Sequence, residues 1–214
     1  MNPSQPSPSA FRPAPQGGHQ RRQFLVMLCI FVLPIVAAYA VFFLFPGLRP
    51  TGTTNYGQLV APARPLPALS LRDAAGEAAA PALFKGKWSL VYLGAAACAE
   101  PCRTEIFLAR QVRTALDKDA ARVQRIYIAP DPASLAAARE LLAADHRDLL
   151  LLADAGAKGA RADEFFQPAV ADALYLVDPL GNWMMVYAPR ADQVADFKGI
   201  LKDLKKLLFQ SQVD

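Results

Sequence analysis

The longest apolar run of the chain lies near its N-terminus. No charged residue occurs between Phe24 and Phe45, a stretch of 22 residues. As a helix rising about 1.5 Å per residue, this stretch is about 33 Å long, which is enough to cross the hydrocarbon core of a bilayer. The pattern predicts one transmembrane anchor at residues 23–46. The preceding residues, 1–22, are rich in Pro, Ser and Gln, and this composition predicts a disordered tail.

Beyond residue 66, short apolar runs alternate with stretches of helical periodicity. The expected strands are Ala68–Arg72, Trp88–Leu93, Val123–Ile128, Asp148–Leu152, Ala173–Val177 and Trp183–Tyr187, and the expected helices are Arg103–Lys118, Ser134–Ala144, Ala160–Phe166 and Val194–Leu208. The turn Asp178–Asn182 joins the last two strands into a hairpin. This order predicts an α/β domain at 67–210, with a mostly parallel central sheet, flanking helices and a C-terminal hairpin.

Two features bear on how the domain is attached to the anchor. Residues 47–66 are punctuated by prolines, which predicts a semi-rigid linker.

The apolar run has a second interpretation as a removed signal peptide, because Ala38-Tyr39-Ala40 has the small-x-small pattern of a cleavage site. However, the apolar residues Val41–Phe45 continue past this pattern, where a signal peptide turns polar. We therefore expect an uncleaved anchor, with Cys29 inside it.

The net charge of +4 comes from the N-terminal segment. Before Gly47 there are three arginines and no acidic residue, while the remainder holds 20 Lys and Arg against 19 Asp and Glu. The folded part is therefore nearly neutral, and its charge gives no support for nucleic-acid binding. Arg21 and Arg22 directly precede the apolar run, which favours a cytoplasmic N-terminus. The domain is then expected outside the cytoplasm, where disulfides persist.

The candidate chemistry centres on the segment from Cys98 to Cys102, with the sequence Cys-Ala-Glu-Pro-Cys. It follows the strand Trp88–Leu93 and precedes a helix, so backbone N–H groups and the helix dipole favour a thiolate there. Two sulfurs at this spacing can close a disulfide or bind a soft metal ion. The plainer alternative is that two buried cysteines merely fall close in sequence. Glu100 and Pro101 between them argue against a buried run.

The order of elements and the loop that carries the cysteines resemble the thioredoxin fold. Within that fold, the chain resembles the Sco/SenC family of membrane-anchored cytochrome c oxidase assembly proteins. The resemblance covers the anchor and the domain from Leu66 to Leu208. Its motifs are Gly86-Lys87-Trp88, Tyr92-Leu93-Gly94 leading to Cys98 and Cys102, the acid Glu100 between the cysteines, and Tyr175–Gly181.

The resemblance implies a site and a task. In the Sco/SenC family both cysteines and one distant histidine bind copper, and the pair also cycles between dithiol and disulfide. Cys98 and Cys102 are then the implied catalytic residues and Cu(I) ligands, and thiolates are soft ligands that select Cu(I). The implied partner is the copper-site subunit of cytochrome c oxidase or another oxidase assembly protein. The implied location is a bacterial inner membrane, with the domain in the periplasm.

The third copper ligand of the family has no counterpart at its usual position, which corresponds to about Val170 here. The chain has two histidines. His19 precedes the anchor, and His146 precedes a strand whose start faces away from the cysteine loop in a parallel sheet. We therefore expect His146 at the surface and not as a ligand. Three other side chains are candidates to approach the loop, although methionines on a hairpin mostly pack in the core: Asp172, Met184 and Met185.

Three functions stay open at this point. The first is a copper-handling assembly factor, in which Cys98 and Cys102 hold Cu(I) as thiolates but bind Cu(II) poorly without the histidine. The second is a thiol–disulfide oxidoreductase, in which Cys98 attacks a partner's cysteines and Cys102 resolves the mixed disulfide. The third is a redox-inactive, membrane-tethered scaffold with a structural disulfide. We favour a role in oxidase biogenesis by copper handling, thiol–disulfide exchange or both, and a chaperone over an enzyme.

Overall fold

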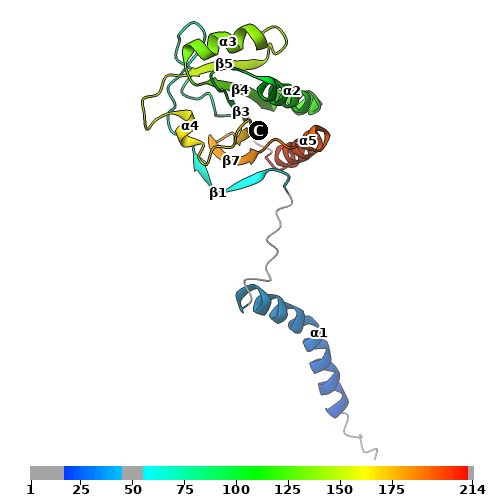
Figure 1. Ribbon diagram of the computed structural model, residues 1–214. Helices are drawn as coiled ribbons and strands as arrows, with labels where there is room; N and C mark the ends of the chain where they lie inside the picture. The colour runs from blue at the N-terminus through cyan, green and yellow to red at the C-terminus, as the bar shows by residue number, and fades with distance from the viewer. Residues whose placement is uncertain (1–16, 45–54, 212–214) are drawn as a thin grey trace, which may run out of the picture. The chain divides into compact units, whose positions relative to one another are not determined.

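The computed structural model describes residues 17–44 and 55–211, with side chains from residue 21 onward (Figure 1). The chain divides into two compact units, Met1–Gly52 and Thr53–Asp214. In the first unit, α1 spans Gly17–Leu44 and contains Pro34. Its segment Arg21–Leu44 has a mean hydropathy of 2.8 and is long and apolar enough to cross a membrane. The predicted tail lies outside the described residues up to residue 16, and the predicted linker lies outside them up to residue 54.

Within residues 55–211, seven strands form one sheet in the order β1-β7-β6-β3-β4-β5-β2. The strands are β1 (Gln58–Pro65), β2 (Leu71–Arg72), β3 (Trp88–Leu93), β4 (Val123–Ala129), β5 (Leu149–Asp154), β6 (Leu174–Val177) and β7 (Asn182–Tyr187). Strands β3, β4 and β5 run parallel, and the other pairs are antiparallel. The predicted α/β fold with a C-terminal hairpin is confirmed. The sheet as a whole is mixed, because the hairpin β6–β7 joins β3 antiparallel and both edge strands add further antiparallel pairs.

The helices of the second unit cover the two faces of the sheet unequally. They are α2 (Glu100–Thr114), the 3₁₀ helix η2 (Asp117–Arg122), α3 (Pro132–Leu142), α4 (Ala162–Phe165) and α5 (Gln193–Gln210). Side chains of α2, α3 and α5 pack in one core cluster with β3 and β4. The short α4 packs in the second cluster, and Figure 1 shows it across the sheet from α2 and α5. Crossovers between parallel strands are right-handed as a rule, and β3–α2–β4 and β4–α3–β5 follow one another in the same direction across the sheet, so α2 and α3 are expected on one face.

β1 lies within the segment that the sequence predicts as a linker. It pairs with β7, with Gln58 opposite Val186. Proline lacks a backbone N–H, so Pro62 and Pro65 are tolerated at a sheet edge, where one row of backbone groups has no partner strand. Just before β1, the N–H groups of two successive residues donate to the Asp203 carboxylate of α5. The compact unit, which extends from Thr53, therefore includes this edge strand.

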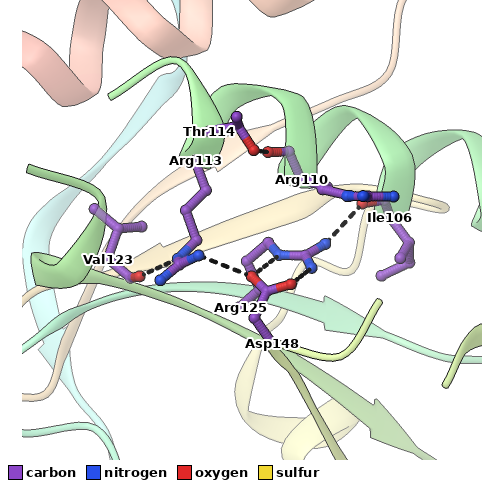
Figure 2. Close-up of polar contacts among 7 residues, drawn as sticks. All are labelled: Ile106, Arg110, Arg113, Thr114, Val123, Arg125 and Asp148. Atoms are coloured by element: carbon purple, nitrogen blue, oxygen red, sulfur yellow. Dashed lines mark hydrogen bonds and ion pairs between the residues drawn. The ribbon is translucent and has the colours of Figure 1, made fainter. Parts of the chain in front are cut away.

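A buried arginine fixes the middle of α2 against the sheet (Figure 2). Arg125 of β4 is 1% exposed. Its Nη2 lies 2.5 Å from Asp148 Oδ1, its Nε donates to Asp148 Oδ2, and its Nη1 donates to the Ile106 carbonyl at 3.1 Å. Arg113 of α2 reaches the same carboxylate at 3.0 Å and also donates to the Val123 carbonyl. Because the buried charge is paired and its donors are used, it stabilises one position of α2. The N-terminal end of α2 carries the predicted site.

Candidate functional site

The two predicted site residues lie together where β3 connects to α2. Cys98 precedes the helix, Cys102 lies in its first turn, and they form a disulfide with their Cα atoms 5.2 Å apart. The N-cap residue, Ala99, makes no side-chain capping bond, and proline follows in the first turn. Since proline has no N–H, it fits a position where helix N–H groups have no intrahelical partner. The remaining first-turn amides and the helix dipole favour a thiolate once the disulfide is reduced.

The sulfur pair is covered, while the loop around it is exposed. Cys98 is 6% exposed and Cys102 is 4% exposed, and both pack in the α2–α5 core cluster. The alanines 95–97 before Cys98 are exposed, as are Ala99 and Glu100. Glu100 pairs with Arg103, which lies one turn further along α2. That arginine offsets the negative charge of Glu100, which would otherwise oppose thiolate formation beside the pair.

Two tyrosines of the core cluster that holds the cysteines stack between the neighbouring strands β3 and β4. Tyr92 and Tyr127 have ring centroids 5.8 Å apart with planes 13° apart. The Tyr92 hydroxyl donates to Asp172 Oδ1 at 2.6 Å. Burial, followed by this bond, raises the pKa of Tyr92 far above its ordinary value. The loop before β6 is therefore fastened to β3 close to the cysteine loop.

Gly94 allows Tyr127 to approach the loop that carries the cysteines. The Gly94 N–H donates to the Ile128 carbonyl at 2.8 Å. A Cβ at this position would overlap the Tyr127 hydroxyl, so a larger residue would push the loop or the ring away. Among the described residues the Tyr127 hydroxyl has no hydrogen-bond partner. The glycine of the Tyr-Leu-Gly motif is thus explained by a close contact with an aromatic ring.

A buried carboxyl group that the sequence analysis did not single out lies on the same helix as Cys102. Glu105 follows Cys102 by three residues and is 4% exposed. Burial, followed by the negative charges of Asp196 and Asp172, raises the pKa of Glu105 to about 7. The sequence signal is an acid on the apolar face of α2, next to Ile106 and one turn before Ala109, two positions that are buried. An acid at such a position departs from the pattern of an amphipathic helix.

His146 is buried, so its predicted surface position is wrong. It is 7% exposed, because the turn between α3 and β5 folds the imidazole inward. Its backbone N–H donates to the Leu142 carbonyl at 2.9 Å. Burial, followed by the charge of Arg125, lowers the pKa of His146. Since β5 runs parallel to β3 through β4, the start of β5 lies at the sheet edge opposite the cysteine loop.

Val170 takes the position that corresponds to the family's histidine. Its N–H donates to the Tyr175 hydroxyl at 3.0 Å, and that hydroxyl donates back to the Val170 carbonyl. The valine side chain packs against the second core cluster. The site therefore has an apolar residue where the third ligand is expected. His19 lies among the residues whose side chains are not described.

The remaining ligand candidates have other roles. Asp172 accepts the Tyr92 hydrogen bond, Met185 is fully buried in the core, and Met184 packs against that core. In residues 21–44 and 55–211, no three His, Cys, Asp or Glu side chains are grouped so that they could hold a metal ion. The residues present do not fit a three-ligand copper site. They fit a site made by the two sulfurs alone, once the disulfide is reduced.

Comparison with known proteins identifies the family of the domain. Residues 88–211 match the family model described as "Transmembrane-like, thioredoxin-like, C-terminal domain". The chain belongs to this family. No curated protein matches its sequence. The apolar helix α1, the thioredoxin-like domain and the disulfide together support a membrane-anchored thioredoxin-fold protein.

Solved Sco structures share the fold of this family member. Apo Sco1 from Thermus thermophilus is 19% identical, with a TM-score of 0.52 over 73% of this chain and 99% of that one. Copper-bound ScoI from Arabidopsis thaliana is 20% identical, with a TM-score of 0.50 over 64% and 96%. Copper-bound yeast Sco1 is 20% identical, with a TM-score of 0.50 over 66% and 89%. These similarities confirm the resemblance to Sco proteins at the level of the fold.

Proposed function

We propose that this protein is a membrane-anchored thiol–disulfide exchange protein that assists the biogenesis of cytochrome c oxidase. The observation that carries the proposal is the Cys98–Cys102 disulfide at the N-terminal end of α2, within an exposed loop. A pair in this position combines a thiolate that the helix N-terminus stabilises with a second thiol that can close the ring. The proposed reaction reduces a cysteine pair of the partner, so that the partner can take up copper.

The exchange begins with the reduced pair. The Cys98 thiolate attacks one sulfur of the partner's disulfide, a mixed disulfide forms, and the partner's other sulfur leaves as a thiolate. Cys102 then attacks Cys98, which releases the second partner thiolate and closes the Cys98–Cys102 bond. Two electrons pass from the pair to the partner's cysteines. Cys98 is assigned the attack because it precedes the helix and its neighbours Ala97 and Ala99 are exposed, whereas Cys102 is held within the first helical turn; both sulfurs are themselves buried.

The proposed location and partner follow from chemistry and from the Sco resemblance. A disulfide persists in an oxidising compartment, and Arg21 and Arg22 at the start of the apolar segment favour a cytoplasmic N-terminus. We therefore propose a single-pass protein of a bacterial inner membrane, with residues 24–45 in the bilayer and the domain in the periplasm. The copper-site subunit of the oxidase, or another assembly protein, is the proposed partner.

Copper delivery is the second candidate function, favoured by the 5.2 Å Cα separation of the two cysteines. After reduction, their thiolates form a soft donor pair that suits Cu(I) as cargo. Without an imidazole at position 170, the same pair is a poor site for Cu(II). Copper-bound Sco structures with this fold support this alternative.

The test uses the full chain in detergent micelles, with Cys29→Ser to remove the free cysteine in α1. The reduced protein is mixed with a peptide that contains one disulfide, and peptide reduction is followed by mass spectrometry. We expect rapid reduction that is lost in Cys98→Ser, and a trapped mixed disulfide in Cys102→Ser. A peptide that remains oxidised, or is reduced equally well by Cys98→Ser, rules out the exchange function. Anaerobic Cu(I) titration of the same variants tests the second candidate, which fails if binding does not depend on the cysteines.

A further inference from the structure

The outer side of α5 carries cations and exposed apolar side chains but no acid. Three lysines on it are exposed, and Val194 and Phe209 are 61% and 79% exposed. At about 100° per residue, these five side chains fall within about a quarter of the helix circumference. We call this surface the basic face; its residues are Val194, Lys198, Lys202, Lys205 and Phe209.

The acidic residues of α5 lie on its inner side and already have donors. Asp196 and Asp203 are each 2% exposed. Asp203 accepts from the backbone N–H groups of Tyr56 and Gly57. Asp196 accepts from the Tyr56 hydroxyl at 2.5 Å and from the Arg190 N–H at 2.9 Å. Neither carboxylate is therefore available to neutralise the lysines of the basic face.

The lysines of the basic face repel one another. Lys198 and Lys202 are one turn apart, as are Lys202 and Lys205, and like charges at these spacings destabilise a helix. Within the part of the chain that the structure describes, none of the three lysines makes an ion pair. On the exposed side of α2, by contrast, Arg103 pairs with Glu100. The basic face is thus left complementary to an external anionic surface.

The chain enters the domain beside this face. The Tyr56 ring lies against Gly199 of α5, where a Cβ would overlap it, and Lys206 Nζ donates to Asn55 Oδ1 at 3.5 Å. Residues 45–54 connect this entry point to α1, and a chain of ten residues reaches at most about 35 Å. The tether therefore keeps α5 within reach of the bilayer that holds α1.

We propose that the basic face of α5 docks on the anionic lipid headgroups of the membrane in which α1 is anchored. The lysine ammonium groups bind headgroup phosphates, while Phe209 and Val194 enter the boundary between headgroups and acyl chains. The short tether favours this occupant over a soluble acidic protein, because the bilayer is always at hand. The inference goes beyond thiol–disulfide exchange and depends only on the membrane anchor.

The test measures how fast each lysine reacts with an acetylating reagent. The full chain is reconstituted in nanodiscs of phosphatidylcholine, with or without phosphatidylglycerol, and a short pulse of reagent is followed by mass spectrometry. Lys158, an exposed lysine in the loop after β5, is the internal control. Both kinds of nanodisc hold α1 in the same way, so a difference between them reports on the domain and the lipid charge.

We expect the three lysines of the basic face to react about threefold or more slowly in the anionic nanodiscs, because each is drawn to the charged surface. Lys158 should react equally fast in both. Raising the salt to about 1 M shortens the screening length to about 3 Å and should abolish the difference. Phe209→Ser should weaken the protection, since it removes the apolar part of the contact.

A charge-reversal pair tests whether the basic face itself makes the contact. In Lys202→Glu with Lys205→Glu, Lys198 remains as the reporter and should lose its protection. The matched control is Arg139→Glu with Arg147→Glu, which changes the net charge equally at exposed positions in α3 and just before β5. Lys198 should stay protected in this control.

Three results would overturn the proposal: equal acetylation of the basic face in neutral and anionic nanodiscs, protection of Lys198 that survives the reversal of Lys202 and Lys205, or equal protection of Lys158. The first would also be the result if the face served a soluble acidic partner. Should the reversal variant not fold, the lipid and salt dependence of the parent decides alone. Loss of the exchange activity would leave this inference standing, because none of these measurements involves the cysteines.

Discussion

Tyr92 of β3 donates its hydroxyl hydrogen to Asp172 Oδ1 at 2.6 Å. Tyr92 is 2% exposed and stacks on Tyr127, whereas Asp172 has a positive φ of 54° in the loop before β6. The bond therefore joins two segments that are 80 residues apart in sequence. It also places a carboxylate near Glu105, whose pKa that charge raises. The hydrogen bond therefore fixes the position of an aspartate that acts on the buried Glu105 of α2.

Replacing Tyr92 by phenylalanine should destabilise the domain by about 1–3 kcal/mol, because it leaves a partly buried carboxylate without its donor. Chemical denaturation of the full chain, followed by tryptophan fluorescence, measures the change. Asp172→Asn keeps an acceptor for the hydroxyl and should cost less. A Tyr92→Phe variant as stable as the parent would show that the hydrogen bond adds nothing to the fold.

Loss of Asp148 should destabilise the domain by about 3 kcal/mol, because Arg125 is 1% exposed and would keep a buried charge without a counterion. The variant is Asp148→Ala, and the measurement is the free energy of unfolding in urea. The control is Asp163→Ala, which removes a more exposed partner of Arg161 and should change stability by about 0.5 kcal/mol or less. Equal effects of the two variants would contradict the structural role given to Arg125.

The pH dependence of stability should carry the signature of Glu105. Its pKa is raised from 4.5 to about 7 in the folded protein, so the folded state holds a proton that the unfolded state releases. Stability is therefore fully present below pH 4.5 and falls as the pH rises through about 7. Glu105→Gln lacks this penalty and should exceed the parent by about 1–3 kcal/mol at pH 8, with no gain at pH 4. A gain that does not change with pH would contradict the shifted pKa.

The edge strand β1 should contribute to the stability of the domain. A chain that begins at residue 67 loses the pairing of β1 with β7 and the donors that Tyr56 and Gly57 give to Asp203. We expect its thermal unfolding midpoint to lie several degrees below that of a chain that begins at residue 53, since about 1 kcal/mol shifts a midpoint by about 2–4 °C in a domain of this size. Circular dichroism measures both midpoints, and identical values would show that β1 is dispensable.

The sequence predicted those elements whose hydrophobic pattern is strong. The strand Trp88–Leu93 was predicted with the bounds that β3 has, because a nearly continuous apolar run between a turn and a loop matches a central strand covered on both faces. The turn at Asp178 identified the hairpin, because its carboxylate accepts from the Leu180 and Asn182 N–H groups as an Asx turn does. For the strand and for the turn, the local sequence was sufficient to predict the element.

Other features depend on contacts that the sequence does not display. β1 lacks a strand pattern because its prolines are tolerated only at an edge, and which strand it joins is decided by β7. His146 is polar, so its burial between α3 and β5 could not be read from periodicity. Glu105 is a single acid in an apolar stripe, and its pKa is raised first by burial and then by Asp196 and Asp172, which are far away in sequence.

The central claim is that the Cys98–Cys102 pair takes part in exchange and is not an inert bridge. The reduction potential of the pair tests this most directly. The full chain, with Cys29→Ser, is equilibrated with defined ratios of reduced and oxidised dithiol, and the fraction of free cysteines is measured by alkylation and mass spectrometry. We predict a potential above about −300 mV, in the range of exchange-active pairs. A value below about −300 mV, typical of structural disulfides, would contradict the account.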